Sequence, residues 1–226
     1  MNMNMFEQFA SPEFIHTPTI LLSMLIPVML IHNKPKLLGN RMTTTLLWLL
    51  KTIMTNMTNQ LTPDGQKWCR ILTSLLLLIL LSNLVGLLPY TFTTTSQLSM
   101  NMAMAMPLWM ATVMTGMMKK PSITLAHLLP EGSPTPLIPL MILIETMSLF
   151  MRPLALGVRL TANITAGHLL INMISSTALN FIHTNITLSA LTSTLLLLLT
   201  LLELAVACIQ AYVFVLLITL YLQENT

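Results

Sequence analysis

Charged residues are scarce in this chain. Only 8% of its 226 residues are Asp, Glu, Lys or Arg, whereas 54% are hydrophobic, and the mean hydropathy is +0.78. A chain so poor in polar side chains cannot cover the surface of a soluble globule. Several apolar stretches approach the roughly 20 residues that cross a bilayer as a helix, and alternating, barrel-type segments are missing. The composition therefore predicts an all-α integral membrane protein.

Patterns typical of metal and nucleotide sites are also missing. The two cysteines, Cys69 and Cys208, lie far apart, and no two of the five histidines form a pair at ligand spacing on one helix. The seven glycines include no phosphate-binding loop, and no nucleophile elbow occurs. We expect no metal, no cofactor, no nucleic-acid partner and no enzymatic activity of the chain alone. Its function then depends on ionisable groups within the membrane.

Six helical segments are expected along the chain, which is treated as a single membrane domain, 1–226. In order they are a span at 18–31, an amphipathic surface helix at 41–61, spans at 71–88 and 102–118, and two long segments at 136–180 and 185–222. The long segments exceed a perpendicular crossing, since about 40 helical residues measure roughly 60 Å. We expect them to form a tilted hairpin that turns near His183 to Asn185, with Pro139 and Pro153 as candidate bends.

Lysine and arginine are distributed unevenly between the ends of these segments. The stretches expected inside hold Lys34, Lys36, Arg41, Lys51, Lys67, Arg70, Lys119 and Lys120, and the stretches expected outside hold none. By the positive-inside rule, the N-terminus is expected outside and the C-terminus inside. The N-terminal 14 residues show neither the basic region of a signal peptide nor the Arg-rich pattern of a transit peptide.

Ionisable and polar residues gather in the expected hairpin, where each costs free energy unless it is paired or hydrated. They are Glu145, Arg152, Arg159, Asn163, His168, Glu203 and Gln210. Arg159 and Asn163 share a helix face because they are four residues apart. With the expected turn, antiparallel pairing places Gln210 opposite Arg159, and Glu203 beside His168.

Arg159 keeps its charge in any protein environment, whereas carboxyl and imidazole groups exchange protons. Glu145 lies 14 residues before Arg159 and His168 lies nine after it, so protonatable groups occur on both sides of one fixed cation. This layout predicts two separate proton half-paths with an electrostatic barrier between them. An inert ion pair of Arg159 with Glu203 would leave Glu145 and His168 unexplained.

Other polar residues are expected to have structural roles. Arg152 is interpreted as a residue near a bend, with its aliphatic stem in apolar surroundings. Asn83, in the span 71–88, is interpreted as a helix-contact residue. His127 and Glu131 are interpreted as solvated loop residues.

Three stretches carry a resemblance to subunit a of F-type ATP synthases, in the form found in animal mitochondria. They read PTPLIPLMILIET at 134–146, LGVRLTANITAGHLL at 156–170 and LLELAVACIQAYVFVLL at 201–217. The resemblance covers the whole chain. It implies a non-catalytic, proton-translocating stator subunit in the mitochondrial inner membrane, with its N-terminus toward the intermembrane space and its C-terminus toward the matrix.

The same resemblance implies roles and partners. Arg159 is the expected essential arginine that faces the carboxylates of a rotating c-subunit ring, with Asn163 and Gln210 as its polar neighbours. His168 and Glu203 would line the half-channel open to the intermembrane space, and Glu145 would belong to the matrix half-channel. The bacterial pattern has a carboxylate where this chain has His168 and a histidine where it has Glu203. The expected partners are the c-ring, peripheral-stalk and other small membrane-sector subunits, and lipid.

Two other functions are compatible with a helical membrane protein. An antiporter-like proton transporter subunit of a respiratory complex would show internal repeats and intramembrane lysines, and neither occurs here. A purely structural membrane anchor would not need polar residues at the middle of the membrane. Both fit the sequence less well than the proton-translocating subunit.

Overall fold

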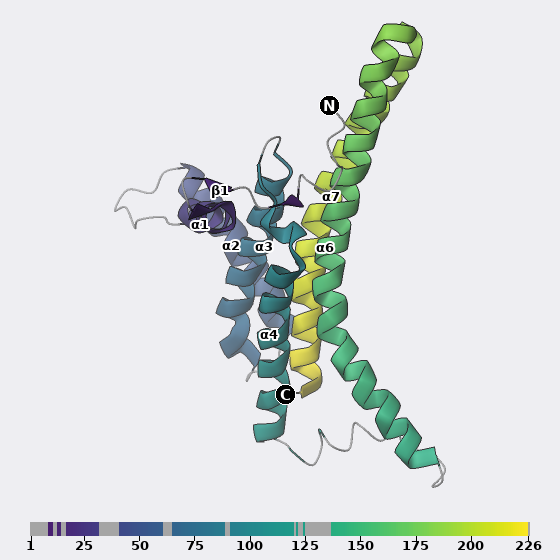
Figure 1. Ribbon diagram of the computed structural model, residues 1–226. Coiled ribbons are helices and arrows are strands. Elements are labelled where there is room, and N and C mark those ends of the chain that lie inside the picture. Colours follow the sequence, from purple (N-terminus) through teal and green to yellow (C-terminus); the bar gives the residue numbers. More distant parts are fainter. Residues whose placement is uncertain are drawn as a thin grey trace. The chain divides into compact units, whose positions relative to one another are not determined.

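The computed structural model describes residues 9–10, 13–14, 17–31, 41–60, 65–88, 91–119, 121, 124 and 137–225. The prediction of an all-α protein is confirmed, because these residues are helical apart from short connections and one antiparallel pair of two-residue strands, β1 (Glu13–Phe14) and β2 (Thr17–Pro18). The α-helices (Figure 1) are α1 (Thr19–Ile31), α2 (Arg41–Gln60), α3 (Cys69–Gly86), α4 (Leu98–Lys119), α6 (Ile138–Thr184) and α7 (Ile186–Asn225). The expected loop residues His127 and Glu131 lie outside the described part.

Each expected helical segment corresponds to a helix, with shifts at the ends. A short 3-10 helix, η2 (Gly65–Trp68), leads directly into α3, so that this helical segment begins before the expected start at residue 71. A second one, η3 (Thr94–Ser96), precedes α4.

Three helical segments of the described chain are long and apolar enough to cross a membrane. They are Gly65–Gly86, Ile138–Ile182 and Ile186–Glu224. At 22 residues, α4 is long enough but less apolar, since Asn101, Thr112 and Lys119 interrupt its methionines. In α1, the described helix has only 13 residues. The spans expected at 18–31 and 102–118 therefore stay predictions, although both segments are helical.

The two longest helices meet at a single residue. Thr184 ends α6, Asn185 follows, and Ile186 begins α7. The Asn185 N–H donates to the Phe181 carbonyl at 2.9 Å, and the Asn185 carbonyl accepts from the Ser189 N–H at 3.1 Å, so that backbone bonding continues through the turn. The turn therefore lies within the expected stretch, His183 to Asn185.

The two expected bends differ in their place along α6. Pro139 is the second residue of the helix, where its missing N–H removes no helical hydrogen bond. Pro153 lies inside the helix, where it removes one bond and favours a bend.

The chain divides into two compact units, and α3, α6 and α7 each contribute to both. Unit 1 comprises Met1–His32, Leu78–Leu98 and Arg159–Tyr212, and unit 2 comprises Asn33–Leu77, Ser99–Val158 and Val213–Thr226. The buried apolar side chains of unit 1 are Ile79, Leu160, Ile164, Ala207 and Ala211. Those of unit 2 are Cys69, Leu72, Leu76, Ala105, Trp109, Leu156, Phe214, Val215, Ile218 and Leu222.

Candidate functional site

In unit 1, α6 presents Arg159, Asn163 and Gly167 at intervals of four residues, so they follow one face of the helix. The Arg159 side chain is exposed. Among the described residues, its guanidinium forms no ion pair and no hydrogen bond. An exposed, unneutralised cation on an apolar helix is available to an anion from outside the chain.

Asn163 connects this face to α7. Its amide nitrogen donates to Oε1 of Gln210 at 2.9 Å, and the Gln210 residue is only 7% exposed. Gln210 is expected opposite Arg159, and its hydrogen-bond partner lies one turn further along α6. Counting residues from the turn gives the height of each Cα atom, whereas a glutamine side chain reaches several ångströms along the interface.

Glu203 lies against Gly167. A Cβ atom on Gly167 would be 2.8 Å from the carboxyl carbon of Glu203, closer than real Cβ contacts. The Glu203 residue is buried, at 8% exposed. Only a glycine leaves room for this carboxyl group at the surface of α6.

His168 follows Gly167 directly in the sequence, and its expected place beside Glu203 stays a prediction. No hydrogen bond joins the two side chains within the described residues. Instead, Nε2 of His168 and Oε1 of Glu203 are both buried atoms without a protein partner there. Buried polar atoms without partners are uncommon and favour ordered water or a mobile proton at the position.

Asn83 of α3 also contacts α7 within unit 1. It is fully buried, and its amide nitrogen donates to the Ala207 carbonyl at 3.5 Å. Its interpretation as a helix-contact residue is confirmed.

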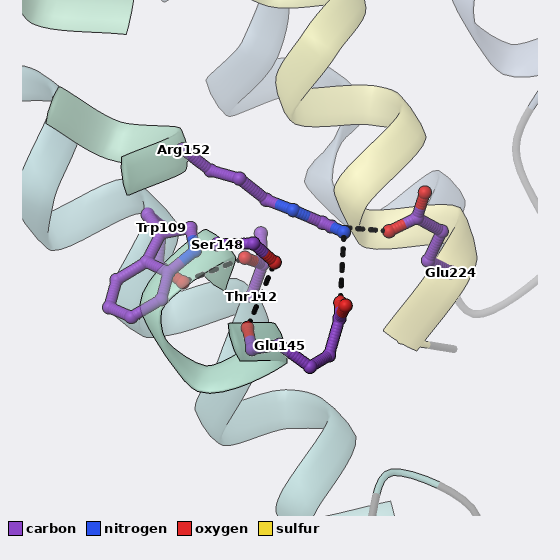
Figure 2. A network of polar contacts seen from close by, with 6 residues as sticks. All are labelled: Trp109, Thr112, Glu145, Ser148, Arg152 and Glu224. Atoms are coloured by element: carbon purple, nitrogen blue, oxygen red, sulfur yellow. Dashed lines mark hydrogen bonds and ion pairs between the residues drawn. The ribbon is translucent and has the colours of Figure 1, made fainter. Parts of the chain in front are cut away.

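Glu145 lies in unit 2, in a second group of charges shown in Figure 2. One guanidinium nitrogen of Arg152 lies 2.7 Å from Oε2 of Glu224 on α7, and the other terminal nitrogen lies 3.9 Å from Oε1 of Glu145 on α6. The guanidinium also lies over the ring of Tyr221, 5.1 Å from its centroid. Arg152 is therefore an ion-pair residue, a role that the interpretation as a residue near a bend did not include.

Sequence reasoning missed Glu224 and Tyr221. The available signal was weak, because a lone acidic residue in the last turn of a helix is usually solvated. Tyr221 and Glu224 are three residues apart and share a face of α7, but only the structure shows that Arg152 lies opposite them.

The described residues contain no group of three or more His, Cys, Asp or Glu side chains able to hold a metal ion. Both cysteines are free thiols, and Sγ of Cys69 donates to the Met54 carbonyl at 3.6 Å, which links α3 to α2. The chemistry that the two charged groups support is proton exchange and electrostatic attraction.

Comparison with known proteins identifies the family of the chain. Residues 14–223 match the family model for the ATP synthase A chain. The chain is 79% identical over 226 residues to the ATP synthase F(0) complex subunit a of Lycodon semicarinatus and 61% identical to that of Struthio camelus, covering the full length of both chains in each case. It is also 57% identical over 228 residues to the subunit of Xenopus laevis. With its family motifs on α6 and α7, the chain belongs to the ATP synthase A chain family.

Proposed function

We propose that this chain is the proton-translocating stator subunit of an ATP synthase membrane sector in the mitochondrial inner membrane. In this role it provides two offset half-channels and one arginine that together couple proton flow to rotation of a ring of c subunits. The observation that carries the proposal is Arg159, which is exposed and unpaired within the described residues on a predominantly apolar helix. A guanidinium in that position costs about 2.5 to 3.5 kcal/mol at the centre of a membrane, so a partner from outside the chain is needed to offset the cost.

The outer half-channel is assigned to His168 and Glu203. Support comes from their buried atoms, His168 Nε2 and Glu203 Oε1, which have no protein partner in the described chain. A proton entering from the intermembrane side passes by way of these groups to a carboxylate of the ring. The neutralised carboxylate can then turn into lipid without the cost of a buried charge.

Arg159 separates the two half-channels. An ionised ring carboxylate is attracted to the guanidinium, and the guanidinium cannot release a proton to it. Asn163 and Gln210, bonded to each other at 2.9 Å, belong to the polar surroundings of this cation. Each proton that crosses 100 mV releases about 2.3 kcal/mol, and the attraction between the ring carboxylate and the fixed charge couples that free energy to rotation.

The inner half-channel is assigned to Glu145. Its side chain is 38% exposed and lies beside Arg152, so it can exchange protons with water. The ring, the peripheral stalk and the small membrane-sector subunits are the proposed partners, and the catalysis of ATP synthesis belongs to other subunits of the complex.

The test is passive proton flux through membranes that hold the assembled complex with its catalytic head removed. Flux is measured with and without a carbodiimide that blocks ring carboxylates. We expect native flux to be blocked by the reagent. We expect Arg159→Ala to lose reagent-sensitive flux by about a hundredfold or more, since an electrostatic partner of a transferring group contributes at that level. Arg159→Lys should also fail, because an ammonium group lacks the guanidinium fork and can lose its proton.

Arg70→Ala is the matched control, since it removes one exposed arginine at the start of α3. Reagent-sensitive flux in Arg159→Ala at the native level would overturn the proposal. Native flux that ignores the reagent would do the same, and it would favour the antiporter-like transporter.

A further inference from the structure

In unit 2, the Arg152 guanidinium contacts two carboxylates, those of Glu224 and Glu145 (Figure 2). The shorter contact joins Arg152 to Glu224 at 2.7 Å, and the longer contact joins it to Glu145 at 3.9 Å. The first contact meets the distance of a charge-assisted hydrogen bond, whereas the second is an ion pair without one. The group therefore has two acidic side chains and one basic side chain.

The Arg152 side chain is held from more than one side. Tyr221 lies under its guanidinium at 5.1 Å, a cation–π contact that adds to the ion pair with Glu224. Because Tyr221 and Glu224 are both on α7, Arg152 ties the last turns of α7 to α6. The residues of α4 drawn beside the group, Trp109 and Thr112, carry no charge.

We propose that Arg152 is a positioning residue of the inner proton path. It holds Glu224 beside Glu145 and supplies one positive charge for two carboxylates, so that one of the two always remains available to take up a proton. This inference rests on the proposed function, in which Glu145 belongs to the inner half-channel. It adds Arg152 and Glu224 to a path that sequence reasoning confined to Glu145.

The proton balance of the step is simple. A proton that arrives from the ring forms an O–H bond on the Glu145 carboxylate, and Glu145 becomes neutral while the guanidinium keeps its bond to Glu224. The proton then leaves to water on the inner side, and Glu145 regains its negative charge. Arg152 stays protonated throughout.

Two roles of Arg152, as a structural clamp alone or as a positioning residue, lead to different expected results. If Arg152 only ties α7 to α6, its loss lowers the amount of assembled complex and leaves the flux per complex unchanged. If Arg152 also sets the charge balance of the two carboxylates, its loss lowers the flux per assembled complex.

The experiment measures carbodiimide-sensitive proton flux per assembled complex, with the amount of complex determined on native gels. In Arg152→Gln we expect the flux to fall roughly threefold to tenfold, because removing one counter-charge changes proton release by about a factor of ten or less. Exchanging the charges, with Arg152→Glu and Glu224→Arg in the same chain, restores the pair and should return most of the flux. Arg41→Gln, which removes one exposed arginine from α2, is the matched control and should conduct normally.

Native flux in Arg152→Gln would overturn the inference, and so would a loss of flux that the exchanged pair does not restore. If the complex with Arg152→Gln fails to assemble, the variant with exchanged charges is the only test of the inference. Assembly with flux supports the inference, and assembly without flux overturns it.

The failure of this inference can be told apart from the failure of the proposed function. A native level of reagent-sensitive flux in Arg159→Ala would remove the proposed function, whatever Arg152 does. Loss of flux in Arg159→Ala together with native flux in Arg152→Gln would remove only the role of Arg152.

Discussion

At the scale of the single residue, Gly167 gives Glu203 the space that its carboxyl group occupies. The carboxyl carbon of Glu203 lies 2.8 Å from the place where a Cβ atom on residue 167 would be, and the Glu203 residue is buried. The position of the Glu203 carboxyl group therefore depends on the absence of a Cβ atom at residue 167.

Gly167→Ala tests this dependence. The added methyl group should push the Glu203 carboxyl group away from its site and lower reagent-sensitive proton flux about tenfold, by analogy with an overpacked core that costs 1 to 3 kcal/mol. Shortening the acid in the same chain, with Glu203→Asp, should recover part of the flux because it withdraws the carboxyl group by one methylene.

Gly157→Ala is the matched control. There the new methyl group would meet the Sδ atom of Met102, the far end of a flexible side chain. We expect near-native flux. Equal losses in Gly157→Ala and Gly167→Ala would mean that a general packing defect, and not the carboxyl group, is responsible.

Residue types could be predicted from the sequence better than their contacts. Arg159 and Glu203 are conspicuous as ionisable residues in apolar helices, and their cost in a membrane follows from chemistry alone. The role of Gly167 could not be predicted, because it depends on which side chain lies opposite. The ion pair of Arg152 with Glu224 joins residues 72 positions apart, and only the packing of the hairpin brings them together.

At the scale of the element, the hairpin of α6 and α7 positions the site. The residues of α7 that matter, Glu203 and Gln210, are seven apart and lie on one face of the helix. On α6 they meet Gly167 and Asn163, which are four apart. The long side chains of Glu203 and Gln210 extend along the interface and make up the difference between the two spacings.

A one-residue insertion tests the register. An alanine inserted after Ala205 rotates Gln210 by about 100° relative to Glu203 and moves it about 1.5 Å along the helix. One of the two residues must then leave the α6 interface, so we expect reagent-sensitive flux to be lost. Flux is measured per assembled complex, as for the other variants.

The control is an alanine inserted after Asn185, in the turn. Turns tolerate added residues because both helices can keep their packing. Substantial flux is expected there. If both insertions conduct equally well, the alignment of Glu203 with Gln210 is not needed for the path.

The hairpin itself could be predicted, because its two segments are too long for perpendicular spans and a polar stretch separates them. Its exact contacts could not. Residue counting from the turn placed Gln210 opposite Arg159, whereas the structure bonds it to Asn163.

At the scale of the whole molecule, the predicted topology depends on whether α4 crosses the membrane. Its 22 residues are enough to cross the membrane, but its polar residues make it less apolar than the three candidate spans. Its exposed methionines, with Met118 at 83% exposed, are suited to lipid or to another apolar surface.

Cysteine labelling tests whether α4 crosses the membrane. In a chain with Cys69→Ser and Cys208→Ser, single cysteines are placed by Thr91→Cys before α4 and by Met118→Cys near its end. We expect a thiol reagent that cannot cross membranes to label position 91 from the outer side only and position 118 from the inner side only. Labelling of both positions from one side would show that α4 does not span.

Asn185→Cys serves as the reference, because the turn of the hairpin is expected on the same side as position 91. The labelling also tests the orientation that the distribution of lysine and arginine predicts.

Because Gly167 contacts Glu203, the substitutions that position 167 tolerates depend on which residue already occupies position 203. Every amino acid except glycine has a Cβ atom, so position 167 has no conservative replacement while a glutamate occupies position 203. A change of Glu203 to a shorter acid would first have to open the space, and only then could a small side chain at 167 be tolerated. The two positions can therefore change in one order and not in the other, although they are 36 positions apart in the sequence.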